Sequence, residues 1–302
     1  MKDLRNPGRW WSRNQQRVIP YLFILPFYIL FAIFMVYPIC FGLYLSLHEW
    51  SGIGDMLFVG SGNYLNLFRD QDFRLALLNT FWYMGASLVI NLVFSLLLAT
   101  MLNSTLVRGR KILRTIYFIP IVTSIVAAAI VFTLFYDRDY GLFNLPLILS
   151  GRAPLDWLGD VSLSKLAVIG LIAWRWTGFN MVYFLAGLQS IPPLLYEAAL
   201  IDGANALQRF FRITLPLLKP IILFVTVITL TGSIQVFEEP YVLTGGGPAD
   251  SSMSVVMYLF RTGMEYLRLG YAAAIGFFLF GTVFIFSWIQ MNLMGIFGER
   301  EL

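Results

Sequence analysis

Residues 197–220 read EAALIDGANALQRFFRITLPLLKP, a polar stretch in a chain that is apolar on both sides of it. Asp202-Gly203 in its middle predicts a tight turn, because glycine adopts the positive φ that such turns need. The flanking segments, Leu194–Ile201 and Ala204–Ile213, predict two short helices. The stretch therefore predicts a compact helix–turn–helix, small enough to fit a groove on another protein. An ordinary connection between two helices is the alternative.

The composition of the chain indicates an all-α membrane protein. Hydrophobic residues make up 58% of the 302 residues and charged residues only 13%, whereas soluble domains carry about 25% charged residues. Crossing a bilayer as a helix takes about 20 apolar residues. Pro216 and Pro220 predict a kink where the fifth apolar run begins. Six runs predict six transmembrane helices at Val18–Leu47, Leu75–Leu102, Ile112–Tyr136, Leu163–Gln189, Ile213–Phe237 and Tyr271–Phe297.

The basic residues predict how the chain is oriented. Thirteen lysines and arginines fall in one alternating set of connections and seven in the other, and positive charge favours the cytoplasmic side. Both termini and the loop 190–214 are therefore expected in the cytoplasm. We divide the chain into a cytoplasmic tail (1–17) with no fold of its own, a first helix with an outer loop (18–74), a five-helix core (75–297) and a second cytoplasmic tail (298–302).

Several function classes are excluded by what the sequence lacks. It has no G-x-x-x-x-G-K-[ST] phosphate loop, no zinc-protease or serine-hydrolase motif, and no acidic residue inside the predicted helices. The single cysteine, Cys40, and the single histidine, His48, do not make a metal site. The net charge of +4 is spread along the chain without a basic face for nucleic acid. We therefore expect no enzyme, no bound cofactor and no metal, and the lack of acidic residues inside the helices argues against a proton relay.

The loop carries a pattern that resembles the EAA loop of ABC importer permeases. Its residues are Glu197-Ala198-Ala199, Asp202-Gly203-Ala204 and Phe210, followed by Leu215-Pro216 and Pro220. In that family the loop forms a coupling helix that inserts into a cleft of the cytoplasmic ATPase. The resemblance, which spans residues 18–297, implies the type-1 permease fold. It also implies an ATPase-coupling role for Glu197, Ala198, Ala199, Asp202, Gly203, Ala204 and Phe210.

The segments beside the loop resemble the carbohydrate branch of the family, related to the maltose, lactose and glycerol-phosphate permeases. They lie within residues 178–192 and 241–248, and the large outer domain and added N-terminal helices of the maltose type are missing. The resemblance implies a multi-pass protein of the bacterial cell membrane. Its implied partners are a second permease subunit, two ATP-binding subunits that use ATP and Mg, and an extracytoplasmic solute-binding protein. Contact with that binding protein is implied for Gly245, Gly246, Gly247 and Pro248, against the alternative of a flexible outer loop.

A solute site is expected near the bilayer midplane, where helices that rearrange meet. Aromatic rings stack on the apolar faces of sugars, and arginine, asparagine and hydroxyl side chains bond to sugar hydroxyls. Helical spacing places Ile172, Arg175, Trp176, Phe179 and Tyr183 on one face with Asn180 at its edge. We predict a pathway lined by Arg175, Trp176, Phe179, Asn180, Tyr183, Thr229 and Ser233. The alternatives are hydroxyl bonds to neighbouring backbone and an ion pair of Arg175 with Glu238 or Glu239.

These features predict a permease subunit of an ATP-driven, binding-protein-dependent importer of a sugar or oligosaccharide. If Arg175 contacts the solute, the alternative cargo is an acidic or phosphorylated solute, such as glycerol phosphate or an acidic oligosaccharide. A stand-alone carrier, which needs no ATPase, is a further alternative. A membrane-embedded enzyme would need a polar catalytic cluster, which the predicted helices lack.

Overall fold

The computed structural model describes residues 7–104 and 107–293, so the predicted tail 298–302 lies outside the described residues. Within these ranges the only strands form one short antiparallel hairpin, in which His48 is paired with Phe58. The elements in chain order are α1 (Pro7–Phe31), η2 (Ala32–Val36), α2 (Tyr37–Ser46), β1 (His48–Glu49), β2 (Leu57–Phe58), α3 (Gly62–Arg69), α4 (Gln71–Asn103), α5 (Arg110–Val122), α6 (Ile125–Phe135), α7 (Leu145–Leu149), α8 (Leu163–Ser190), α9 (Pro193–Ile201), α10 (Ala206–Arg209), η3 (Phe210–Thr214), α11 (Leu215–Leu217), α12 (Lys219–Ile234), α13 (Glu238–Leu243), α14 (Val255–Phe260), η4 (Arg261–Glu265) and α15 (Leu269–Leu293).

Four of the predicted membrane spans are single long helices. They cover Gln16–Ser46, Gln71–Asn103, Leu163–Ser190 and Leu269–Asn292, close to the predicted runs. Each is longer than the ~20 residues that a bilayer requires. The two remaining runs are bent, so the described chain has four spans, or up to six if each bent pair is one span.

The predicted third span is divided into α5 and α6, which are bent by 102° relative to each other. Thr123 and Ser124 have extended backbone, with ψ of 142° and 126°, and they end α5 after Val122. α6 then packs against α13, and its small side chains Ala128 and Ala129 enter a shared apolar core. The predicted third run is therefore a bent pair of helices and not one straight helix.

The fifth run bends by 66° between Ala206–Leu217 and Lys219–Ile234. Pro220 lies in the first turn of α12, where a helix loses no hydrogen bond to proline, and Pro216 lies just before the bend. Leu218, at the bend itself, is fully buried. The kink predicted from the two prolines is confirmed.

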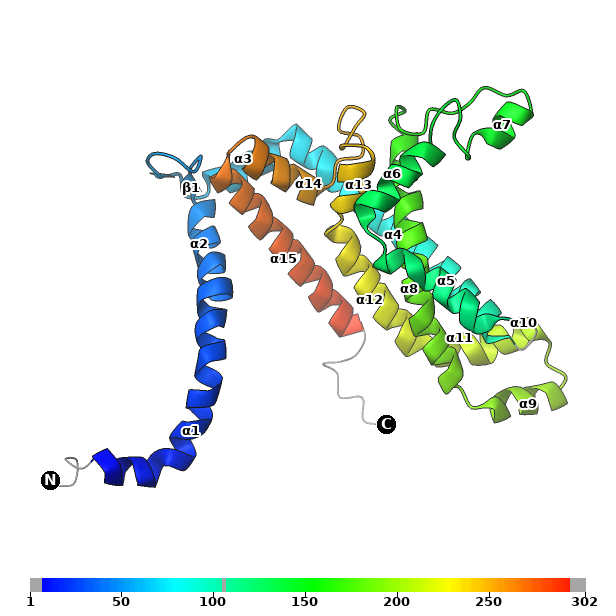
Figure 1. Cartoon of the computed structure of the whole chain (residues 1–302), viewed down its shortest axis with the longest axis horizontal. Helices are drawn as coiled ribbons and strands as arrows, with labels where there is room; N and C mark the ends of the chain where they lie inside the picture. Colours follow the sequence, from blue (N-terminus) through cyan, green and yellow to red (C-terminus); the bar gives the residue numbers. More distant parts are fainter. Residues whose placement is uncertain (1–6, 105–106, 294–302) are drawn as a thin grey trace.

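The first helix stands apart from the rest of the bundle. α1 begins at Pro7, so residues 7–17, expected to have no fold of their own, are helical. Residues 9–19 contain neither glycine nor proline, so nothing interrupts the helix before the apolar run. Figure 1 shows its first turns pointing away from the remainder of the helix. None of the most apolar window of Gln16–Ser46 is buried.

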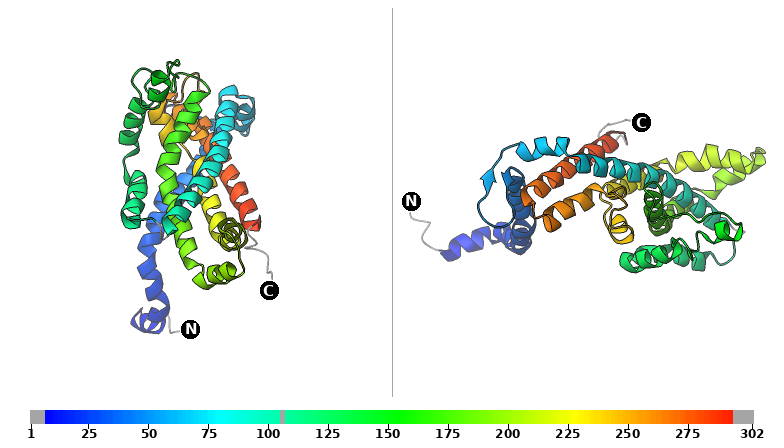
Figure 2. Two further views of the ribbon diagram at one scale, coloured as in Figure 1. Left: turned by 90° about the vertical axis from the view of Figure 1, so that its right-hand side faces the viewer. Right: turned by 90° about the horizontal axis from the view of Figure 1, so that it is seen from above.

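The loops lie at two opposite ends of the bundle. Figure 1 shows α9, α10 and the last turns of α15 at one end, which we call the α9 end. It shows α3, α7, α13 and α14 at the other, which we call the α13 end. Seen from above, the helices spread along one long axis (Figure 2). The helix–turn–helix loop and the loop Gly245–Pro248 after α13, which we call the glycine loop, are therefore on opposite sides of the helical layer.

Helices α4, α8 and α12 form the centre of the bundle, where α12 contacts both of the others. Ser95 Oγ on α4 donates to the carbonyl oxygen of Thr177 on α8 at 2.8 Å. Gly178 lies so close to α5 that an added Cβ would be 1.6 Å from the carbonyl oxygen of Tyr117. Glycine is therefore required there by the close approach of two helices.

Candidate functional site

The predicted coupling loop forms two short helices joined by a turn, which we call the knuckle (residues 193–214). α9 ends at Ile201, and Gly203 has a φ of +77°, in the left-handed region that favours glycine. Asn205 and Gln208 then form a capping box that starts α10. The predicted helix–turn–helix is confirmed, with the second helix starting at Ala206 instead of Ala204.

Hydrogen bonds connect the two halves of the knuckle. The hydroxyl of Tyr196 on α9 lies 2.9 Å from Oγ1 of Thr214 at the end of η3. The N–H of Ala204 donates to the carbonyl oxygen of Ala199 at 2.9 Å and closes the turn. Because Thr214 directly precedes α11, these bonds tie the knuckle to the start of the fifth run.

Apolar side chains of the knuckle face outward at the α9 end. Ile201 is 87% exposed, Leu194 71% and Leu207 68%, and no described part of the chain covers them. Such side chains on a projecting element are typical of a surface that packs against a partner. The predicted coupling residues lie in the same projection: Glu197, Ala198, Asp202 and Gly203 are exposed, and Ala199, Ala204 and Phe210 are half-buried.

A cavity of about 120 Å³ lies between α4, α8 and α12. Four of the predicted pathway residues line it: Trp176 and Asn180 from α8, and Thr229 and Ser233 from α12. The rest of the wall consists of Asn91, Ile172, Ile228, Gly232 and Val236. The wall is thus mostly apolar with a few amide and hydroxyl groups, which is the usual composition of a small-molecule site.

Hydrogen bonds inside the cavity leave one acceptor free. Asn180 Nδ2 donates to Thr229 Oγ1 at 3.4 Å, and Ser233 Oγ donates to the Thr229 carbonyl oxygen at 2.7 Å. Within the described chain, Asn180 Oδ1 is buried and has no partner. A buried polar atom without a partner costs about 1–3 kcal/mol. Asn180 Oδ1 is therefore left with the capacity to accept a hydrogen bond.

Phe179 and Tyr183 do not line the cavity. The ring of Phe179 contacts those of Phe118 on α5 and Trp176, and the ring of Tyr183 lies 5.2 Å from that of Phe224 on α12. Successive residues of an α-helix point in directions about 100° apart. When Asn180 points into the cavity, the preceding residue, Phe179, therefore points away from it. The predicted face is corrected accordingly: the cavity takes every fourth residue, Ile172, Trp176 and Asn180.

Arg175 is paired with two carboxylates. Its Nη1 lies 3.0 Å from Glu238 Oε2 and 3.2 Å from Glu239 Oε1. The side chain of Glu239 is only 5% exposed, and the Nε–H of Arg175 is buried without a partner in the described chain. The ion pair that the sequence offered as an alternative is present, and it connects α8 to α13.

Sequence reasoning missed the contribution of α4 to the cavity. Ser87, Asn91 and Ser95 recur at every fourth residue of α4, and none is more than 2% exposed. Polar residues at this spacing in an apolar span indicate a face turned toward protein or a cavity instead of lipid. That signal was present in the sequence for Asn91, whereas Gly232 has no comparable one.

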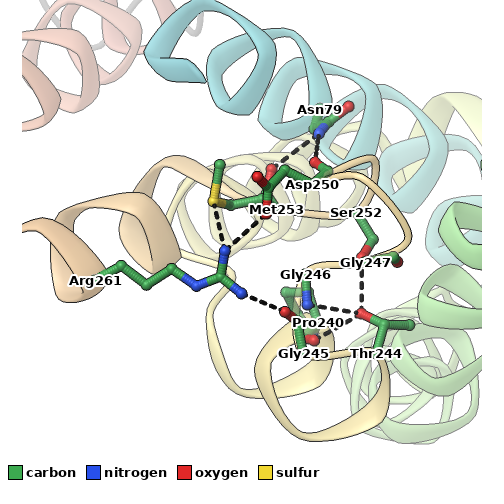
Figure 3. A network of polar contacts seen from close by, with 10 residues as sticks. All are labelled: Asn79, Pro240, Thr244, Gly245, Gly246, Gly247, Asp250, Ser252, Met253 and Arg261. Carbon is green, nitrogen blue, oxygen red and sulfur yellow. Dashed lines mark hydrogen bonds and ion pairs between the residues drawn. The ribbon is translucent and has the colours of Figure 1, made fainter. Parts of the chain in front are cut away.

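The glycine loop at the α13 end is held by a network of polar contacts (Figure 3). Arg261 Nη1 binds Asp250 Oδ1 at 2.7 Å, and its Nη2 donates to the carbonyl oxygen of Gly245. Asn79 of α4 donates to the carbonyl oxygens of Asp250 and Met253 at 3.3 and 3.0 Å. The loop is thereby fixed to both α4 and η4.

Hydroxyl groups hold the loop from its other side. Ser252 Oγ donates to the Gly247 carbonyl oxygen at 2.9 Å, and Thr244 Oγ1 accepts from the N–H of Gly246 at 3.2 Å. Gly246 is buried, whereas Gly245 is exposed and Pro248 is half-buried. These contacts favour a shaped surface over the flexible loop that was the alternative.

Comparison with known proteins identifies the family. Residues 91–294 match the family described as "Binding-protein-dependent transport system inner membrane component". The chain belongs to this family. The match covers most of the helices that form the cavity and the whole knuckle.

Similar permeases cover nearly the whole chain. The arabinooligosaccharides transport system permease protein AraP of Bacillus subtilis is 39% identical over 93% of this permease and 90% of its own length. The lactose transport system permease protein LacF of Rhizobium radiobacter is 38% identical over 89% of this permease and 92% of its own length. A chain of a bacterial alginate ABC transporter, solved with an alginate pentasaccharide-bound periplasmic protein, is 28% identical. It superposes with a TM-score of 0.83 and covers 97% of this permease and 100% of that chain, which confirms the predicted type-1 permease fold.

Proposed function

We propose that this permease is one of two membrane subunits of an ATP-driven importer for a sugar or oligosaccharide. The relatives AraP and LacF are named for the transport of arabinooligosaccharides and lactose. The observation that carries the proposal is the knuckle, a braced projection with exposed apolar side chains at the α9 end of the bundle, in a chain without a nucleotide-binding motif. We place the protein in the bacterial cell membrane, with the knuckle and both termini in the cytoplasm.

The proposed drive comes from two partner ATP-binding subunits that use ATP and Mg. Their closure would displace the knuckle, which is tied to the start of the fifth run through Tyr196 and Thr214. That displacement would turn α12 against α8, and residues of both helices line the cavity. An extracytoplasmic binding protein would deliver the solute at the α13 end, with the exposed part of Gly245–Pro248 as a contact.

The proposed solute contacts are the cavity residues. Trp176 would stack on a sugar ring, and Asn180, Thr229 and Ser233 would bond its hydroxyls. Arg175 acts beside the cavity through its ion pairs. Phe179 and Tyr183 support the wall through their ring contacts.

The coupling proposal is tested by placing valine at Gly203. A β-branched residue there would be forced to adopt a φ of +77°, which distorts the turn that orients α9. Gly54 offers a matched control at the α13 end, because its φ is +82° and an added Cβ at either glycine meets no atom within 4 Å. In the complete transporter in proteoliposomes, we expect Gly203→Val to lower sugar uptake at least tenfold and to weaken co-purification of the ATPase. Gly54→Val should leave both unchanged.

Normal uptake with a full complement of ATPase in the Gly203→Val variant would show that the knuckle does not couple. Uptake by the purified permease alone, without ATPase, would instead support the stand-alone carrier. A second candidate cargo is an acidic or phosphorylated solute, and one observation favours it. The alginate transporter, to which the fold is similar, is involved in the import of an acidic polysaccharide.

A further inference from the structure

We infer that Arg175, Glu238 and Glu239 act as a charge filter that disfavours acidic solutes, so that the cargo is a neutral, hydroxyl-rich sugar. This inference rests on the proposed function, since it takes the cavity between α4, α8 and α12 as the solute contact. The three residues are called the charge cluster below.

The charge cluster carries one guanidinium and two carboxylates. The same atom, Arg175 Nη1, lies within 3.2 Å of both carboxylates, so the ionised cluster has a net charge of −1. Elsewhere in the described chain, no lysine or arginine pairs with Glu238 or Glu239. An anionic solute would therefore meet net repulsion here, although the Arg175 side chain alone would attract it.

The charge cluster borders the cavity on the side of the α13 end. The Cζ atom of Arg175 lies 5.7 Å from the ring centroid of Trp176, and Trp176 lines the cavity. Glu238 follows two residues after Val236, which is also part of the wall. A solute delivered at the α13 end would therefore pass the cluster before it reaches Asn180.

The uncharged wall of the cavity also favours neutral solutes over anionic ones. None of the described residues that line the cavity is charged, and an anion placed there without a partner is strongly disfavoured. Asn180 Oδ1 is a free acceptor, and the Ser233 hydroxyl already donates its hydrogen bond to the carbonyl oxygen of Thr229, which leaves Ser233 Oγ able to accept. A sugar hydroxyl has a proton to donate to such acceptors, whereas an ionised carboxylate has none.

The size of the effect follows from the distances. The carboxylates lie within 3.2 Å of Arg175, whose Cζ is 5.7 Å from the Trp176 ring, so a bound anion would stand on the order of 10 Å from the net charge. At that distance, with an effective dielectric constant near 20, one unit charge changes Kd by about tenfold. Removing one carboxylate should remove about that factor.

The test compares neutral sugars with their own aldonates, in which the reducing end is oxidised to a single carboxylate. The probes are lactose against lactobionate and arabinotriose against its aldonate. Their Kd values are measured by equilibrium dialysis on the purified permease–ATPase complex without the binding protein, so that the binding protein does not contribute to the selection. We expect the wild type to bind the neutral member of a pair at least tenfold more tightly.

Two variants separate the cluster from general charge effects. Glu238→Gln keeps a hydrogen-bond acceptor beside Arg175, and because that side chain is 54% exposed the change does not disturb a packed core. It should reduce the neutral-to-acidic preference about tenfold. Glu265→Gln removes an exposed carboxylate from the same end of the bundle and should leave the preference unchanged.

The possible failures are distinguishable. Equal or tighter binding of the aldonates by the wild type, or an unaltered preference in Glu238→Gln, would overturn the charge filter and leave a sugar permease in place. If no probe binds and none is taken up by the complete transporter, the proposed function fails and the filter fails with it.

Discussion

Replacing Gly178 by alanine is expected to force α5 away from α8. The added Cβ would stand 1.6 Å from the carbonyl oxygen of Tyr117 and 2.5 Å from its carbonyl carbon. Ordinary contact needs about 3.5 Å, so the two backbones would have to separate by nearly 2 Å. Backbone atoms cannot rotate aside as a side chain does. The cost should therefore reach or exceed the upper end of the ~1–3 kcal/mol usual for overpacking.

Gly85 in α4 supplies a matched control, because a Cβ there meets no atom within 4 Å. Alanine in place of a glycine inside a helix is favourable by about 0.5–1 kcal/mol. Thermal unfolding of the detergent-purified permease, followed by circular dichroism, should shift to lower temperature for Gly178→Ala and not for Gly85→Ala. Sugar uptake should fall only in Gly178→Ala, since α8 carries Trp176 and Asn180. Wild-type thermal stability of Gly178→Ala would refute the close approach of α5 and α8.

Two further predictions concern the α13 end. Burial raises the pKa of Asp70, but hydrogen bonds from Tyr258, Tyr271 and two backbone N–H groups outweigh it and hold the pKa below its ordinary value of 3.8. Asp70→Asn should lower the thermal midpoint of unfolding at neutral pH. Because a carboxyl of lowered pKa stabilises the fold only while it is ionised, the difference in midpoint between variant and wild type should disappear as pH falls below about 4. A difference that does not depend on pH would contradict this. Arg261→Gln should weaken binding of the solute-binding protein severalfold in surface plasmon resonance, since the loop at Gly245 loses its charged anchor. Unaltered affinity would remove the loop from the interface.

The long spans were predictable because a bilayer requires every backbone group to be bonded within the helix. The fourth run was predicted at Leu163–Gln189, and α8 covers Leu163–Ser190. Hydropathy reports composition and not direction, however, and the mostly apolar run Ile112–Tyr136 still bends by 102°. That bend places α6 against α8 and α13, and contacts between distant segments leave no local pattern to detect.

The candidate site was predictable only in part, for a related reason. The turn at Gly203 depends on local backbone chemistry, so the knuckle could be placed from the sequence. The cavity depends on how α8 is rotated against α4 and α12. A single helical face therefore included Trp176, which lines the cavity, but also Phe179 and Tyr183, which contact neighbouring rings instead. Asn91 was missed because it belongs to a different helix.

The buried position of Leu218 has a mechanical consequence. Leu218 is fully buried at the 66° bend, in the same apolar core as Leu188 of α8. It sits so close to α8 that a Cβ on Gly187 would be 2.8 Å from its Cδ2 atom. The knuckle and α12 thus meet at a bend that is packed against α8. In the proposed mechanism, force applied to the knuckle would rotate α12, the helix that carries Thr229 and Ser233, about the bend at Leu218.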